Sequence, residues 1–217
     1  MVKQFNFDNI ATEYDKYYQT DFGIKIDEIE KNIIKEFLQE LKSKEIIEIG
    51  CGTGHWTNFL SDLGFIIDAS DISEKMLLEA QNKNIKNAEF SVKNAEQLNY
   101  PDNSADNIIA VTSLEFVENQ QLAVNEIYRI LKPNGYFICA GLNLNSDLGK
   151  NKANDEVYKN AKFFTYNNLN EILSKFGEPK FKAAVVIENS EFTDNKYSEE
   201  QKLEKGAFIA AIVQKIK

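Results

Sequence analysis

Three glycines at alternate positions form the part of the sequence with the clearest chemical meaning. Gly50, Gly52 and Gly54 follow the apolar run EIIEI (residues 45–49) and precede a segment with helical spacing. Glycine adopts positive φ angles without strain and lets a ligand come close to the backbone. In open α/β sheets, ligands bind beyond the carboxyl ends of the strands. We interpret the loop as a ligand-binding turn, with a merely tight strand-to-helix turn as the alternative.

An acidic residue follows at a position that would complete a nucleoside site. Asp71 lies seventeen residues after Gly54, at the end of a second apolar run, FIIDAS. A carboxylate there can accept hydrogen bonds from both hydroxyls of a ribose. The loop and the acid together predict a nucleoside-like ligand. Two alternatives stay open: Asp68, inside the same strand, is a competing acid, and Asp71 could cap the next helix, although Ser73 already serves that role.

The spacing of the glycines argues against two other nucleotide-binding loops. A dinucleotide fingerprint requires Gly-x-Gly-x-x-Gly, but the sixth position is His55 when counted from Gly50 and Thr57 when counted from Gly52. A P-loop requires Gly-Lys-Ser/Thr, which does not follow at the required spacing. A P-loop is therefore excluded, and an NAD-dependent oxidoreductase is an alternative that the spacing disfavours.

The elements that must position these residues alternate along the chain. Short apolar runs with amphipathic segments between them are typical of a parallel sheet with helices on both faces. We predict an amphipathic helix over 24–42, strands at 45–49, 65–71, 88–92, 106–112 and 135–141, and helices at 56–63, 74–83 and 119–131.

The pattern changes after residue 141. An Asn/Lys/Asp-rich stretch within 142–165 is too polar for the core and long for a plain connection. A last helix is predicted over 167–176, followed by the strands KFKAAVVIE and AFIAAIVQKI, which the charged loop 189–205 joins. Such a loop can join antiparallel neighbours, so the ending is predicted as a hairpin at the sheet edge.

Four segments resemble, in order and spacing, the class I S-adenosylmethionine-dependent methyltransferases, in particular the small type 11 group. They are EIGCGTG, DISEKMLLEAQ, NAEQLNYPDNSADNIIAVTSLEF and EIYRILKPNGYFICAG, and the likeness is strong over residues 7–141 and weak over the remainder. The resemblance implies an enzyme with S-adenosylmethionine as cofactor. It implies an α/β fold with a doubly wound, mostly parallel, seven-stranded Rossmann-like sheet, an antiparallel C-terminal hairpin strand and an N-terminal helical lid.

The resemblance also implies one domain over residues 1–217, in three parts. Residues 1–42 would be the lid and first helix, residues 43–141 the cofactor-binding core, and residues 142–217 an acceptor-side loop, the last helix and the hairpin. The cofactor contacts that it implies are Tyr14, Glu48, Gly50, Cys51, Gly52, Gly54, Asp71, Ile72, Met76, Asn94, Ala95, Glu96 and Thr112.

These contacts have distinct implied roles. The glycine loop would pass under the methionine and ribose, Glu48 would orient the loop or reach the amino group, and residues 112–114 would face the methionine. Asp71 would bind the ribose, Ile72 and Met76 would pack on the adenine, and the segment from Asn94 to Glu96 would border it. Tyr14, in the lid segment FDNIATEYDKYY, would close over the cofactor. Asn94 departs from the family, which usually carries Asp there. Plain core packing is the alternative for Ile72 and Met76, and an aromatic staple is the alternative for the tyrosines.

The amino-acid composition indicates which binding partners and which cellular compartment to expect. The formal net charge is −9, and Arg129 is the only arginine, so we expect no nucleic-acid substrate. Cys51 and Cys139 lie in different apolar contexts without CxxC spacing, so neither a metal site nor a disulfide is expected, and a reducing, cytoplasmic setting fits best. No apolar leader or membrane-spanning run is present in the sequence, so we expect no membrane partner.

No residue is assigned as a general base. Methyl transfer from a sulfonium needs mainly alignment, and a base is needed only where the acceptor must lose a proton. His55, Glu115, Tyr17 and Tyr18 are candidates. Enzymes that methylate exocyclic amines of bases or of glutamine typically carry Asn/Asp-Pro-Pro-Tyr after the fourth strand, where this chain has TSLE at residues 112–115. Methylation of cytosine C5 needs a cysteine nucleophile, but Cys51 lies in the glycine loop and Cys139 in the predicted fifth strand. We therefore expect a small-molecule acceptor, with a non-catalytic cofactor-binding module as the alternative.

Overall fold

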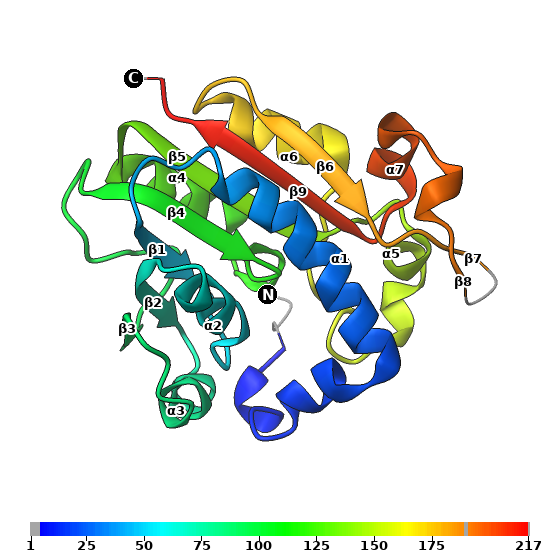
Figure 1. Cartoon of the computed structure of the whole chain (residues 1–217), viewed down its shortest axis with the longest axis horizontal. Coiled ribbons are helices and arrows are strands. Elements are labelled where there is room, and N and C mark those ends of the chain that lie inside the picture. Colours follow the sequence, from blue (N-terminus) through cyan, green and yellow to red (C-terminus); the bar gives the residue numbers. More distant parts are fainter. Residues whose placement is uncertain (1–4, 189–190, 217) are drawn as a thin grey trace.

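A mixed seven-stranded sheet forms the centre of the molecule (Figure 1). The computed structural model describes residues 5–188 and 191–216. The strands of the large sheet are β1 (Glu45–Ile49), β2 (Ile66–Asp71), β3 (Ala88–Val92), β4 (Ala105–Val111), β5 (Leu131–Leu142), β6 (Lys180–Ala184) and β9 (Phe208–Gln214). Their order is β3-β2-β1-β4-β5-β9-β6, in which β1 to β5 are parallel and β9 is antiparallel to β5 and β6. The predicted sheet with its antiparallel ending is confirmed.

Helices cover both faces of the sheet. On one face lie α1 (Asp21–Leu38), α2 (His55–Asp62) and α3 (Glu74–Asn82), and on the other lie α4 (Gln120–Ile130) and α6 (Tyr166–Ser174) (Figure 1). Each face has its own apolar cluster. Ile34 and Leu60 are fully buried in the first, and Ile127 and Leu169 in the second. This arrangement explains why the strands read as near-continuous apolar runs.

Two short 3-10 helices, η1 (Phe7–Asn9) and η2 (Tyr14–Gln19), precede α1. Polar contacts tie this N-terminal segment to the elements that follow β1 and β2. The Ser73 hydroxyl donates to the Asp8 carboxylate, and the Thr53 hydroxyl donates to Asp15 at 2.6 Å. Lys83 forms an ion pair with Asp15, also at 2.6 Å. The N-terminal helical segment therefore lies against the start of α2 and contacts both ends of α3.

Some boundaries differ from the sequence-based prediction. The first helix spans Asp21–Leu38 rather than 24–42, because Thr20 caps it by accepting a hydrogen bond from the Gly23 N–H. β5 begins at Leu131 rather than at residue 135. The register shifts between the Ala105–Leu131 and Asn107–Tyr136 pairs, so the residues predicted as a turn form a bulge inside the strand.

The C-terminal half contains more structure than predicted. The expected loop 189–205 includes β8 (Glu191–Phe192), which pairs with β7 (Ile187–Glu188), then η5 (Asp194–Lys196) and α7 (Glu199–Lys205). The polar stretch after β5 forms α5 (Asp147–Asn151) and η4 (Lys152–Asn154). The expectation that this stretch avoids the core is wrong at Asn143, which is fully buried. Burial of this polar side chain is tolerated because its amide donates hydrogen bonds of 3.0 Å to the carbonyl oxygens of Leu203 and Gly206.

The only arginine of the chain holds the connection between β3 and β4. The Arg129 guanidinium donates hydrogen bonds of 2.7 Å to the carbonyl oxygens of Leu98 and Tyr100. It also pairs with the carboxylates of Asp102 at 2.7 Å and Glu126 at 2.8 Å. Glu126 in turn accepts a hydrogen bond from the Leu98 N–H at 2.9 Å. One planar cation thereby fixes this connection to α4.

Replacing Arg129 with lysine should lower the free energy of unfolding by about 1–3 kcal/mol, because an ammonium group cannot make all four contacts. Urea denaturation measures the change, and hydrogen exchange should show faster exchange over residues 97–103. Lys150→Ala is the matched control, since it removes only an exposed ion pair with Asp147. Equal destabilisation by the two variants would contradict the role given to Arg129.

Three glutamates lie in the interior of the fold. Glu30, Glu48 and Glu115 expose 9%, 3% and 0% of their surfaces. Burial raises the pKa of Glu30 to about 8 and the pKa values of Glu48 and Glu115 to about 7, because desolvation penalises the charged carboxylate. A hydrogen bond from the Thr57 hydroxyl to Glu48, 2.6 Å long, opposes this rise. These carboxyls keep their protons at pH values where they would ionise in the unfolded chain.

The stability of the apo protein should therefore fall as the pH rises from 5 to 8. The unfolded chain releases these protons above about pH 4.5, whereas the folded chain keeps them up to its raised pKa, so rising pH favours unfolding within that window. For Glu48 the loss between pH 4.5 and about 7 amounts to about 3 kcal/mol. Urea denaturation at both pH values should show a smaller loss for Glu48→Gln than for the wild type. The same pH dependence in both proteins would contradict the assignment.

Candidate functional site

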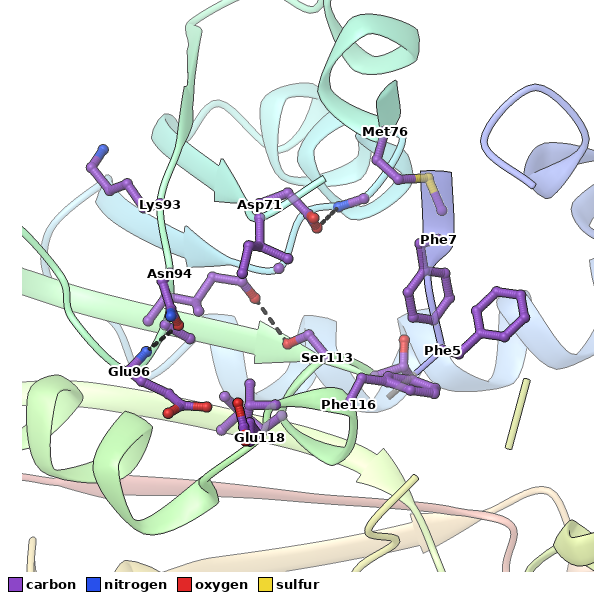
Figure 2. A pocket seen from close by; sticks show the side chains of 18 of the residues that line it. Phe5, Phe7, Asp71, Met76, Lys93, Asn94, Glu96, Ser113, Phe116 and Glu118 are labelled. Carbon is purple, nitrogen blue, oxygen red and sulfur yellow. Dashed lines mark hydrogen bonds between the residues drawn. The ribbon is translucent and has the colours of Figure 1, made fainter. Parts of the chain in front are cut away.

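A cavity of about 520 Å³ lies at the carboxyl ends of β1, β2 and β4 (Figure 2). The parallel register creates it: Ile49 is paired with Ser70 of β2 and Asp71 with Val92 of β3, so the loops that follow these strands leave the sheet at one edge. The volume lies within the usual range for small-molecule sites. The sequence-predicted cofactor residues that line it are Tyr14, Gly50, Gly52, Asp71, Ile72, Met76, Asn94, Ala95, Glu96 and Thr112.

The glycine loop forms the floor at the end of β1. Gly50 and Gly52 have positive φ angles of 72° and 54°. A Cβ atom on Gly50 would lie 2.3 Å from the Cβ of Ser113, so only glycine lets this loop pack on the segment after β4. A Cβ atom on Gly52 would meet no atom within 4 Å, so this backbone faces open space. Gly50 thus serves packing, and Gly52 keeps the backbone accessible to a ligand.

Asp71 holds the glycine loop and faces the cavity at the same time. Its Oδ2 accepts a hydrogen bond of 2.8 Å from the Gly52 N–H (Figure 2). Its Oδ1 accepts one from the Ser73 N–H, also at 2.8 Å. Burial raises the pKa of Asp71 above its usual value, while these backbone hydrogen bonds act against the rise. Each carboxylate oxygen has a further lone pair available for a ligand hydroxyl.

A second wall comes from α3 and the segment after β3. The Ile72 side chain is 68% exposed, whereas Met76 is buried and reaches the cavity from α3. The Asn94 side-chain oxygen accepts a hydrogen bond of 2.9 Å from the Glu96 N–H, and the Glu96 carboxylate accepts one of 2.7 Å from the Asn119 N–H at the start of α4. Asn94 therefore uses its oxygen to fix the local turn.

The end of β4 closes the cavity on a third side. Thr112 has a positive φ of 46°, an uncommon conformation for a branched side chain. The Ser113 hydroxyl then donates a hydrogen bond of 2.9 Å to the carbonyl oxygen of Ile49, which joins the ends of β1 and β4 (Figure 2). Both residues, with Leu114, line the cavity as the resemblance implies.

Sequence reasoning missed an aromatic wall. Phe7 contacts Phe116 edge to face, with ring centroids 4.9 Å apart, and lies next to Phe5 and Tyr14 at 5.1 and 6.2 Å (Figure 2). No local pattern announces these contacts, because they join the N-terminus to η3 (Leu114–Phe116), which is distant in sequence. The lining residues that were not predicted are Phe5, Phe7, Ile49, Lys93, Phe116, Val117 and Glu118.

Three predicted cofactor residues do not line the cavity. Glu48 is buried beneath the loop and bonded to Thr57. Cys51 is a buried free thiol, and burial raises its pKa well above the usual value. Gly54, with a φ of 78°, begins α2, and a Cβ atom there would lie 2.9 Å from Ile85 and 3.0 Å from Ala80. These three residues support the glycine loop on the side that faces away from the cavity.

The other acid considered for the ribose, Asp68, also lies elsewhere. It borders a different hollow and pairs with Lys93 at 3.4 Å. Ser73 caps α3 as predicted, since its hydroxyl accepts a hydrogen bond of 3.1 Å from the Met76 N–H. Asp71 is therefore the acid that the fold brings to the cavity.

The candidates for a general base lie outside the cavity lining. His55 is bonded to Asp27 at 2.6 Å and stacked on Tyr18, with 3.6 Å between ring centroids. Burial acts to raise the pKa of Asp27, but the hydrogen bonds from His55 and Lys31 outweigh it and lower that pKa. His55 thus joins α2 to α1 and η2, an arrangement that differs from both a pocket base and a solvent-facing residue. Glu115 is fully buried.

Two observations concern metal ions and membranes. Within residues 5–188 and 191–216, no group of three or more His, Cys, Asp or Glu side chains is arranged to hold a metal ion. None of the helices in the described part of the chain is both long and apolar enough to span a membrane.

Comparisons with known proteins agree with the geometry. A family model described as a methyltransferase domain, type 11, matches residues 47–139. A ubiquinone/menaquinone biosynthesis C-methyltransferase of Rickettsia bellii is 31% identical over 180 residues, which cover 76% of this chain and 68% of that protein. An uncharacterized protein of Methanocaldococcus jannaschii is 29% identical over 215 residues, covering 97% of this chain and 98% of that protein.

A solved structure from Thermotoga maritima, described as an S-adenosylmethionine-dependent methyltransferase and possible histamine N-methyltransferase, is also similar. It has 27% sequence identity and a TM-score of 0.73, and the match covers 96% of this chain and 98% of that one. The sheet order, the glycine loop with its acid and these relatives agree. The chain therefore belongs to the S-adenosylmethionine-dependent methyltransferases of the type 11 group, enzymes whose cofactor is S-adenosylmethionine.

Proposed function

We propose that this methyltransferase binds S-adenosylmethionine in the cavity of Figure 2 and methylates a small-molecule acceptor. The observation that carries the site is the placement of the Asp71 carboxylate beside the open backbone of Gly52, at the carboxyl ends of β1 and β2. Each oxygen of Asp71 already accepts one backbone hydrogen bond, which fixes the carboxylate's orientation. The remaining lone pairs suit the two vicinal hydroxyls of a ribose.

The remaining walls suit the other parts of this cofactor. Ile72 and Met76 offer apolar surface to an adenine ring, and the turn fixed by Asn94 and Glu96 borders its edge. Thr112 and its neighbours at the end of β4 lie where the methionine portion would extend. We assign a positioning role to Glu48, Cys51 and Gly54, because they support the glycine loop without lining the cavity.

The chain's part in catalysis is mainly positioning. When bound, the cofactor supplies a sulfonium with an activated methyl group. The protein must hold an acceptor nucleophile in line with that carbon and keep water away. The rings of Phe5, Phe7, Tyr14 and Phe116 provide an apolar wall for this purpose.

A small acceptor fits the charge and shape of the molecule better than a nucleic acid. The net charge of −9 with one arginine opposes binding to a phosphate backbone, because such binding depends on clustered cations. The relatives leave the accepting atom open, since one is named as a C-methyltransferase and another as a possible N-methyltransferase.

Asp71→Ala should weaken the binding of both S-adenosylmethionine and S-adenosylhomocysteine at least about tenfold, because the hydrogen bonds to the ribose are lost. Isothermal titration measures this. Asp68→Ala is the matched control: it removes a carboxylate from the same strand but from a side chain outside the cavity, so affinity should stay within about twofold. Equal weakening by both variants, or none by Asp71→Ala, would overturn the site assignment.

Gly52→Val should also abolish measurable cofactor binding while the protein still folds. The valine would fill the space that Gly52 leaves open and would strain a backbone with a φ of 54°, at a cost of about 1–2 kcal/mol. Circular dichroism checks folding and titration checks binding. A folded Gly52→Val variant with wild-type affinity would place the cofactor elsewhere.

A further inference from the structure

Two polar side chains line the cavity just after β3 and have hydrogen-bonding groups left over. Asn94 and Glu96 belong to the segment between β3 and β4, and both are lining residues of the cavity in Figure 2. The apolar side chains of Ile72 and Met76, on which a purine ring would pack, line the same cavity. Asn94 and Glu96 are therefore placed to contact the edge of a purine whose ribose Asp71 holds.

The Asn94 amide is oriented by the turn that follows it. Its Oδ1 accepts the hydrogen bond of 2.9 Å from the Glu96 N–H (Figure 2), and its main-chain carbonyl accepts one of 3.0 Å from the Gln97 N–H. The first bond distinguishes the two ends of the amide, because an N–H donor requires the oxygen opposite it. Within the residues that the structure describes, the amide nitrogen Nδ2 donates to no other group. Asn94 therefore has two unused N–H donors.

The Glu96 carboxylate is also held by one oxygen and leaves the other free. Its Oε1 accepts a hydrogen bond of 2.7 Å from the Asn119 N–H. The Asn119 side chain in turn caps α4 by accepting a hydrogen bond of 3.2 Å from the Leu122 N–H, so Glu96 is anchored to a fixed helix end. Its Oε2 accepts no hydrogen bond from the described residues. Glu96 therefore has an unused acceptor.

The cation next to this pair is engaged elsewhere. Lys93 is also a lining residue, but its ammonium group pairs with Asp68 at 3.4 Å and lies over the ring of Tyr100, 4.5 Å from the centroid. In Figure 2 its side chain points away from the cavity. The segment after β3 therefore offers the cavity a donor from Asn94 beside an acceptor from Glu96.

We propose that Asn94 and Glu96 set the base specificity of the cofactor site: Nδ2 of Asn94 donates to ring nitrogen N1 of adenine, and Oε2 of Glu96 accepts from the exocyclic amino group. This inference rests on the proposed function and names the residues that recognise the base. The N1 edge of adenine is the edge farthest from the ribose, so it reaches beyond Asp71 to the segment after β3. That edge carries an acceptor beside a donor, which complements the donor and the acceptor of this pair.

The same pair discriminates against hypoxanthine, in which the edge is reversed. Hypoxanthine has an N–H donor at N1 and a carbonyl oxygen in place of the amino group. Two donors would then meet at Asn94, and the Glu96 carboxylate would face the carbonyl oxygen, so both contacts become repulsive. Specificity of this kind depends on which atom of each side chain is free, and it can therefore be reversed by exchanging nitrogen for oxygen.

The first test changes the base and keeps the wild-type protein. Isothermal titration with S-adenosylhomocysteine comes first, because absence of binding would overturn the proposed function itself and this inference with it. Two analogues follow: the 1-deaza compound, in which C–H replaces N1, and S-inosylhomocysteine, which carries hypoxanthine. We expect each to bind at least about tenfold more weakly, because one or both hydrogen bonds are lost. Equal affinity for S-adenosylhomocysteine and either analogue overturns the inference and leaves the cofactor site in place.

The second test exchanges donor for acceptor in the protein. Asn94→Asp keeps an oxygen for the turn but replaces Nδ2 with a second oxygen, and Glu96→Gln keeps an oxygen for Asn119 but replaces Oε2 with a donor. Asn94→Asp should bind S-adenosylhomocysteine about tenfold more weakly and S-inosylhomocysteine more tightly than the wild type does. Glu96→Gln should shift the ratio of the two affinities in the same direction, and the double variant should shift it furthest. These ligands carry no sulfonium, so the altered charge has no cationic sulfur to act on.

Asn99→Asp is the matched control. It makes the same change at an exposed residue of the same segment that does not line the cavity, so the ratio should stay within about twofold of the wild type. Unchanged or tighter binding of S-adenosylhomocysteine by Asn94→Asp would place the amino group rather than N1 opposite this side chain and would overturn the inference. Circular dichroism checks that each variant folds. If one does not, the comparison of analogues on the wild-type protein decides alone.

Discussion

The parallel pairing of β1 with both of its neighbours is the constraint on which the rest of the structure depends. Because β1 lies between β2 and β4, the loops after all three strands leave the sheet at one edge. The Asp71 carboxylate can then accept a hydrogen bond from the Gly52 N–H, and the Ser113 hydroxyl can donate one to the Ile49 carbonyl at the end of β1. A change of register in β1 would separate these groups, since neighbouring side chains in a strand point to opposite faces.

Local signals predicted the elements on which this edge is built. β1 and β3 have the predicted bounds, and Ser73 caps α3 as expected, because short apolar runs and capping residues act within a few positions of themselves. The sequence pattern was less informative where contacts span the chain. Phe7 reaches the cavity by packing on Phe116, and a hydrogen bond to Asp27 draws His55 away from the cavity. Neither partner is visible from local spacing.

The glycine loop shows how a motif combines several tasks. Gly52 keeps backbone open to a ligand, Gly50 admits Ser113, and Gly54 packs on α3 at the start of α2. Family resemblance groups all three as cofactor contacts, whereas the structure separates their tasks. Family membership also decides between the classes considered at the outset, because a methyltransferase replaces both the NAD-dependent oxidoreductase and the non-catalytic module.

The hydroxyl of Ser73 has two partners, and this has a consequence for motion. It accepts the capping hydrogen bond of α3 and donates to Asp8 in the N-terminal segment. Neither η1 nor η2 contains a fully buried residue. The segment can therefore separate from α3 while the cap stays intact and water replaces the broken polar contacts. Opening of this kind would be a local unfolding event that leaves the sheet and its helices folded.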